Sequence, residues 1–186
     1  PNAYVLERYL GWTTCHGFEQ SLAELVASDD VARIVVPVDS PGGLVVGVQG
    51  AAEALRAAAQ VKPVHALVHP VAASAAYWIA SGATEITLTP GSVVGSIGVA
   101  REASAAVGPD MMGRQVSVHL SSHARAKIPD PTSEAGRAEL QRGLDMAEAA
   151  FHAAVAAGRG MSVEDLLSRA SATGAPEDGG AVWFGA

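Results

Sequence analysis

Two short apolar runs, separated by one segment of helical periodicity, constrain the fold of this chain more than any other feature. The runs are "ARIVVPV", residues 32–38, and "PVHALVH", residues 63–69. The first run is continuous, apolar and rich in β-branched residues, which is typical of a strand buried on both faces of a parallel sheet. The second run is predicted as a second strand. Apolar residues recur at helical spacing between them, which predicts a helix over 44–60. The order indicates a β-α-β unit with a right-handed crossover.

The rest of the chain continues this pattern. We predict a helix over about 73–82, strands over 85–90, 95–100 and 116–122, and helices over 133–157 and 162–170. The last 16 residues are rich in Gly and Ala and weakly patterned. No repeat or linker divides the sequence, so we expect one α/β domain over residues 1–186.

Composition excludes several classes of protein. Of 186 residues, 49% are hydrophobic and 17% charged, a balance that suits a globular chain. The net charge of −7 argues against a nucleic-acid partner. Cys15 is the only cysteine and the histidines lack ligand spacing, so no disulfide or metal site is expected. No apolar run reaches the roughly 18–20 residues of a membrane span.

Candidate chemical groups follow the first two predicted strands, where ligands bind in α/β sheets. "DSPGG" ends the first strand, and Gly42 and Gly43 would allow close approach of a substrate to the backbone. "HPVAAS" ends the second and places Ser74 at a helix start. The amides of Ala75 and of one of the two glycines could form an oxyanion hole. A serine here is more often a helix cap, and Pro-Gly-Gly is more often a simple turn.

Taken together, these segments resemble a known family. "DSPGG", then "AASAAYWIAS", then "GSIGV" match the signal peptide peptidase A (SppA) family of serine peptidases in content, order and spacing. The segment from "HARAKIPDP" to "GRGMSVE" is similar to its phage branch, the head-maturation (prohead) proteases. The resemblance covers roughly residues 17–168. It implies the ClpP/crotonase superfamily, built from spiralled β-β-α units, and a Ser–Lys dyad.

The resemblance also implies roles for individual residues. Ser74 takes the position of the nucleophile, and Lys127 that of the base about fifty residues later. Ser96, the serine of "GSIGV", takes the position that orients the lysine. Gly42 or Gly43 supplies one oxyanion amide and Ala75 the other. Two neighbours of the lysine bear on its assignment: Asp130 would keep the amine charged by pairing with it, and Arg125 would replace it in a shifted register.

The implied function is a serine endopeptidase that works through an acyl-enzyme without a cofactor and prefers small apolar residues near the cut. We expect a phage or prophage capsid-assembly protease in the host cytoplasm or prohead, acting on scaffold or capsid protein as a homo-oligomer. The alternatives are a membrane-associated cellular signal-peptide peptidase and an inert assembly component. Because the family's first strand and closing segment are not recognisable, the domain is expected to be clipped at both ends.

Two other chemistries remain open. A Ser-His-Asp triad could use Asp39, His65 or His69, and Ser74, which occur in that order. Crotonase-type acyl-CoA chemistry would use the same fold and an oxyanion hole, but it would need neither Ser74 nor Lys127. The sequence shows no carboxylate pair placed for proton abstraction.

Overall fold

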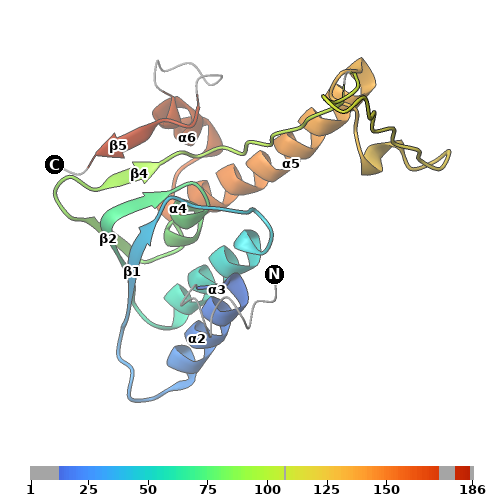
Figure 1. The fold of residues 1–186 in the computed structure, drawn as a ribbon. Coiled ribbons are helices and arrows are strands. Elements are labelled where there is room, and N and C mark those ends of the chain that lie inside the picture. The colour runs from blue at the N-terminus through green and yellow to red at the C-terminus, as the bar shows by residue number, and fades with distance from the viewer. Residues whose placement is uncertain (1–12, 107, 172–178, 185–186) are drawn as a thin grey trace. The chain divides into compact units, whose positions relative to one another are not determined.

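The computed structural model describes residues 13–106, 108–171 and 179–184 (Figure 1). Its elements follow in chain order: α2 (Cys15–Ala27), β1 (Ile34–Ser40), α3 (Val48–Val61), β2 (Val64–Ala73), α4 (Ala75–Ala80), β3 (Glu85–Leu88), β4 (Val93–Gly95), the 3₁₀ helix η1 (Arg125–Lys127), α5 (Glu134–Arg159), α6 (Val163–Ala170) and β5 (Val182–Phe184). The prediction of an α/β fold with a largely parallel sheet and a long helix near the C-terminus is confirmed.

β2 is the central strand of the sheet. It pairs in parallel with β1 on one side, and with β3 and then β4 on the other. β5 adds an antiparallel strand to the outer edge of β4. Ser40 of β1 is paired with Ala72, and Gly95 of β4 is paired with Ala73. The carboxyl ends of three parallel strands therefore meet at one edge of the sheet.

Helices cover one face of this sheet. α2 packs on α3, and α3 contacts both β2 and α4. Leu22, Ile34, Leu55, Val64 and Ala66 form one buried cluster between these helices and the strands. Alternate residues of β1 point away from the cluster, and Val35 is 51% exposed. The prediction that the first strand is buried on both faces is wrong, because in the described part of the chain helices cover only one face.

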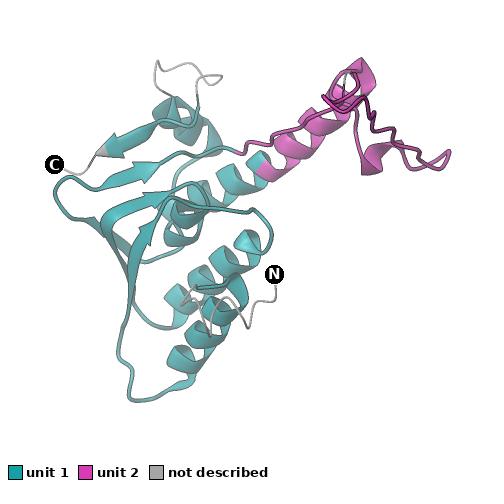
Figure 2. Ribbon diagram, in the orientation of Figure 1, with its two compact units in different colours: residues 1–98, 148–186 teal, residues 99–147 magenta. Residues whose placement is uncertain are grey.

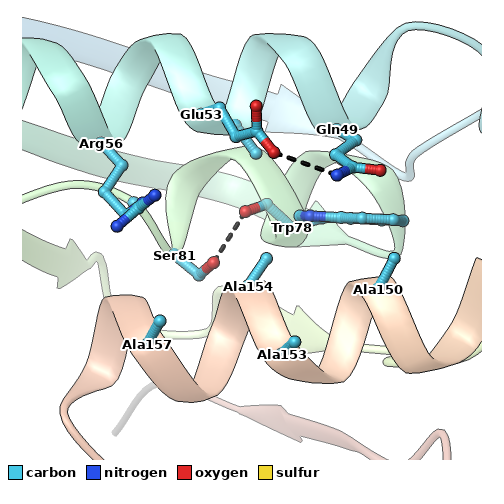
Figure 3. Close-up of a pocket in the computed structure, with 11 residues that line it drawn as sticks. Gln49, Glu53, Arg56, Trp78, Ser81, Ala150, Ala153, Ala154 and Ala157 are labelled. Atoms are coloured by element: carbon cyan, nitrogen blue, oxygen red, sulfur yellow. Dashed lines mark hydrogen bonds between the residues drawn. The ribbon is translucent and has the colours of Figure 1, made fainter.

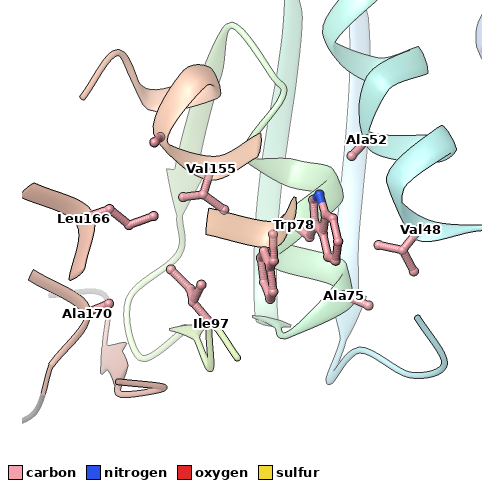
Figure 4. Close-up of a cluster of buried hydrophobic side chains, with 10 residues drawn as sticks. Val48, Ala52, Ala75, Trp78, Ile97, Val155, Leu166 and Ala170 are labelled. Carbon is pink, nitrogen blue, oxygen red and sulfur yellow. The ribbon is translucent and has the colours of Figure 1, made fainter. Parts of the chain in front are cut away.

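A second cluster of buried hydrophobic residues packs α4 against α3, α5 and α6 (Figure 4). It contains residues of α3, α4, α5 and α6, among them Val48, Trp78, Phe151 and Leu166. Trp78 of α4 and Phe151 of α5 stack with ring centroids 4.6 Å apart and planes 7° from parallel. The short helix α4 is therefore buried against α5.

The chain divides into two compact units (Figure 2). The first comprises residues 1–98 and 148–186, and the second comprises residues 99–147. The second unit holds a turn closed by the Arg114–Asp110 ion pair, then η1, then the first half of α5. That the whole chain is one catalytic domain stays a prediction. No helix in the described ranges is both long enough and apolar enough to cross a membrane.

Two predicted strands are absent or displaced, and two elements of the structure were not predicted. Residues 116–122 form no strand, and Val116 and Val118 are 72% and 58% exposed, since no neighbouring strand pairs with them in the part that the structure describes. The strand expected over 95–100 lies instead at Val93–Gly95, because the chain turns sharply at the glycine. Helix α2 and strand β5 were not predicted. The other predicted strands and helices are present, with shifted ends.

Candidate active site

Ser74 lies in a tight turn between the end of β2 and the start of α4. Its backbone has φ 52° and ψ −126°, a conformation that non-glycine residues rarely adopt and that typically costs about 1–3 kcal/mol. It stands at the N-cap position of α4, but its side chain makes no capping hydrogen bond. The Ser74 hydroxyl is half-buried and has no hydrogen-bond partner among the described residues. The simpler interpretation of Ser74 as a helix cap is therefore not supported.

The neighbouring strand and helix hold Ser74 in this conformation. Its N–H donates to the Gly95 carbonyl at 2.8 Å, and its own carbonyl accepts from the Trp78 N–H at 2.9 Å. Both bonds involve the main chain, so they fix the backbone and leave the hydroxyl available. A strained conformation persists only where surrounding contacts of this kind determine it.

Gly42 brings the loop after β1 against Ser74. A Cβ atom at Gly42 would lie 2.7 Å from the Ser74 Cβ and 3.0 Å from the Ala75 nitrogen. Its φ of 102° is also unfavourable for residues other than glycine. Gly42 therefore lies close to the serine turn itself, and a close approach of substrate to this glycine stays a prediction.

The backbone amides distinguish the two glycines. The Gly42 N–H donates to Ser40 Oγ at 3.2 Å. The amides of Gly43 and Ala75 donate to no other group among the described residues. Gly43 and Ala75 therefore carry free N–H donors on the two loops that meet at Ser74, whereas the Gly42 donor is already used.

Ser96 follows β4 as Ser74 follows β2. It has φ 54°, and its N–H donates to the Ala181 carbonyl at 2.9 Å. Because Gly95 is paired with Ala73, the two serines follow directly opposed residues of adjacent strands. These two are also the only described non-glycine residues with positive φ.

Lys127 belongs to the second unit. It ends η1, where its N–H donates to the Ala124 carbonyl at 3.0 Å, and its side chain is exposed. Asp130 does not pair with it: the carboxylate accepts from the Thr132 hydroxyl at 2.7 Å and the Thr132 N–H at 2.8 Å. These two hydrogen bonds from Thr132 lower the pKa of the Asp130 carboxyl, and the bond from the hydroxyl has the larger effect. That Lys127 pairs with Ser74 stays a prediction.

The candidate histidines of the alternative triad are bonded elsewhere. His65 Nε2 lies 2.8 Å from the Thr87 hydroxyl, and His69 Nδ1 lies 2.8 Å from the Thr89 hydroxyl. Both pairs connect strand β2 to β3 or to the turn that follows it. No bond between either histidine and Ser74 or Asp39 occurs among the described residues.

A cleft of about 240 Å³ lies between α3, α4 and α5 (Figure 3). Gln49, Glu53 and Arg56 line it from α3, and alanines of α5 form the opposite wall. Trp78 contributes from α4, and its buried indole nitrogen has no hydrogen-bond partner among the described residues. None of the six predicted site residues lines this cleft. Among the described residues, no group of three or more His, Cys, Asp or Glu is placed to hold a metal ion.

The sequence did not indicate how closely β5 lies against this site. Gly95 has φ 115°, and a Cβ there would lie 2.5 Å from both the Ala181 carbonyl oxygen and the Trp183 ring. β5 therefore presses on the strand that holds the backbone of Ser74. A glycine after two valines, followed much later by the apolar "AVWF", was the only signal, and neither part specifies the pairing.

Comparison with known proteins identifies related chains. A family model described as Peptidase family S49 matches residues 56–185. The chain is 30% identical over 168 residues to the head-tail preconnector protein GP5 of Enterobacteria phage P21, covering 88% of this chain and 33% of that protein. It is 28% identical over 174 residues to the capsid assembly protease C of Escherichia phage lambda, covering 90% and 39%. The chain thus spans less than half the length of these two relatives.

A solved structure is also similar. It is a mutant of the 1510-N membrane-bound stomatin-specific protease in complex with a substrate peptide, with 20% sequence identity and a TM-score of 0.39. The similarity covers 74% of this chain and 60% of that one.

Proposed function

Because this chain belongs to Peptidase family S49, we propose that it is a serine endopeptidase with Ser74 as nucleophile and Lys127 as general base. The observation that carries the proposal is the conformation of Ser74: strained, half-buried and with a hydroxyl that caps no helix. Strain of this kind gathers at functional sites, where the surrounding structure maintains it.

The proposed reaction passes through an acyl-enzyme. Lys127, in its neutral form, takes the proton of the Ser74 hydroxyl as the oxygen attacks the substrate carbonyl. The tetrahedral intermediate collapses, its C–N bond breaks, and the lysine ammonium gives its proton to the leaving amine. Lys127 then takes a proton from water, which attacks the ester, and returns that proton to Ser74 as the second product leaves. Atoms and charge balance over the cycle.

We assign the oxyanion hole to the amides of Gly43 and Ala75. Both donors are free among the described residues, whereas the Gly42 amide is bonded to Ser40. The part of Gly42 is to allow the loop to reach the serine turn. Removing one such donor typically costs about 2.7–4 kcal/mol of transition-state stabilisation.

The base role of Lys127 requires water to be excluded from its amine. A lysine is a base only in its neutral form, which burial favours. Lys127 is exposed in the structure. To act as the base, its amine must become covered in the working enzyme with substrate bound. Ser96 is the proposed partner that orients the amine.

The relatives favour a role in phage head assembly. Two of them carry the names of a head-tail preconnector protein and a capsid assembly protease. We propose that this chain cuts scaffold or capsid protein in the host cytoplasm or the prohead, as part of a homo-oligomer. Cleavage of signal peptides, but not of capsid or scaffold protein, would favour the cellular alternative.

Cleavage of labelled casein by point variants tests the dyad. Ser74→Ala and Lys127→Arg are expected to abolish cleavage, the second because arginine keeps its charge and cannot act as a base. Arg125→Ala, a change two residues away on the same 3₁₀ helix, is the matched control and is expected to retain activity. Undiminished cleavage by either of the first two variants would refute the dyad. An inactive wild type would favour an inert assembly component.

A further inference from the structure

The last turn of α5 is bonded to the end of the helix that carries Ser74. Arg159 Nε donates to the Ser81 carbonyl at 3.1 Å, and its Nη2 donates to the Ala83 carbonyl. Both acceptors lie just beyond the last residue of α4. The guanidinium is half-buried, and burial lowers the pKa of Arg159. No ion pair of Arg159 with a carboxylate occurs in the described part of the chain.

A half-buried cation without a carboxylate partner costs free energy unless its donors are hydrogen-bonded. Arg159 donates from Nε and Nη2 to two main-chain carbonyls at the C-terminal end of a helix, where a positive charge is favoured. The contact therefore fixes the main chain of residues 81–83, and not another side chain.

Gly158, the residue before Arg159, also lies against the 81–83 turn. A Cβ at Gly158 would overlap the Ser81 carbonyl, so the backbones of α5 and of the 81–83 turn lie directly against each other. One helical turn earlier on α4, Trp78 stacks on Phe151 of α5. α5 thus holds the nucleophile helix at two points, one in its middle and one just after its end.

A helix as short as α4 needs such support. It has six residues, too few to be stable by its own hydrogen bonds. Ser74 begins this helix through the Trp78 N–H bond, and Ser81 ends it through its N–H bond to the Tyr77 carbonyl at 2.8 Å. A shift of the 81–83 turn is therefore transmitted to the strained serine through a helix of less than two turns.

We propose that Arg159 is a positioning residue, which holds the C-terminal end of α4 and thereby keeps Ser74 in its strained conformation. The inference rests on the proposed function in one respect, that Ser74 is the nucleophile. Arg159 touches no reacting atom. Its loss should slow the chemical step and leave substrate binding unchanged, because a displaced nucleophile is less well aligned in the transition state.

The test compares Arg159→Met and Arg159→Lys with Arg169→Ala, a control that removes an exposed arginine from α6. Hydrogen exchange by mass spectrometry measures the amides of residues 74–83, and casein-peptide kinetics give kcat and KM per folded enzyme, well below each Tm. For Arg159→Met we expect exchange of this segment to rise by about tenfold or more, and kcat to fall by about 10- to 100-fold at constant KM. Arg159→Lys should be intermediate, and Arg169→Ala should match the wild type.

The outcomes separate this inference from the proposed function. Unchanged exchange in Arg159→Met overturns the inference, and so does faster exchange with an unchanged kcat. A raised KM at constant kcat also overturns it, since it would indicate a binding role. If the wild type cleaves no more than Ser74→Ala, the proposed function fails, and exchange alone then decides whether Arg159 holds α4.

Discussion

Replacing Gly42 by alanine, with Gly43→Ala as its matched control, probes the close approach of the two loops at Ser74. At Gly42 the added Cβ would lie 2.7 Å from the Ser74 Cβ and 2.8 Å from the Ala73 carbonyl oxygen. At Gly43 no atom of the described residues lies within 4 Å of an added Cβ, and φ is not positive. The two variants therefore differ in contacts and strain but not in chemistry.

The expected effects follow from these contacts. Holding alanine at a φ of 102° costs about 1–3 kcal/mol, and contacts under 3 Å to backbone and Cβ atoms force the loop to move. We expect Gly42→Ala to lower the free energy of unfolding by about 1–3 kcal/mol. Moving the loop also displaces the Gly43 donor, so kcat/KM should fall by about 10²–10³-fold. Gly43→Ala should leave stability within about 0.5 kcal/mol of the wild type.

Urea denaturation and cleavage of labelled casein measure the two quantities, with Ser74→Ala as the blank. If Gly42→Ala is as stable and as active as the wild type, Gly42 does not lie as close to the Ser74 turn as the structure has it. If both glycine variants lose the same stability, the loss reflects loop flexibility, and the contact with Ser74 is not its cause.

Two further changes test the packing of α5 on α4 and the N-cap of α6. Phe151→Ala should lower the free energy of unfolding by about 3–5 kcal/mol, because Phe151 is 1% exposed and stacks on Trp78. Chemical denaturation measures this, and a loss below about 1 kcal/mol would contradict the stacking. Ser162→Ala should cost about 1 kcal/mol, because the Ser162 hydroxyl accepts from the Asp165 N–H at 3.0 Å and caps α6. Thermal denaturation beside Ser162→Thr, which keeps the cap, checks this; equal losses in both variants would exclude the hydroxyl as the cause.

The sequence predicted those parts of the fold that depend on local pattern. The apolar runs before Gly42 and Ser74 identified the two parallel strands, and the alanine-rich segment identified α5. The segment at 116–122 alternates as a strand would, yet it forms none in the described structure, because a strand needs a partner that its own sequence cannot specify. The pairing of β5 with β4 was missed because it joins segments about 90 residues apart.

The sequence indicated a set of candidate site residues but not their geometry. Motif spacing brought the Gly42–Gly43 turn to Ser74 on the same sheet edge, and the structure confirms that Gly42 and Ser74 are close. Which glycine has a free amide depended on the Ser40 hydroxyl, a detail that no pattern contains. The hold of Arg159 on the end of α4 joins residues 76 or more apart, so no local signal could reveal it. The roles of all the candidate residues stay predictions: Ser74, Ser96, Lys127, Gly42, Gly43 and Ala75.

Locating the acyl group during turnover shows which residue attacks the substrate. The enzyme is mixed with a p-nitrophenyl ester of an acylated alanine, quenched in acid, digested and mapped by tandem mass spectrometry. We predict one acyl group on Ser74 in the wild type, and none in Ser74→Ala or, at the same time point, in Lys127→Ala. An acyl group on another residue with Ser74 unmodified would rule out Ser74 as the nucleophile. Equal acylation in Lys127→Ala would rule out Lys127 as its base.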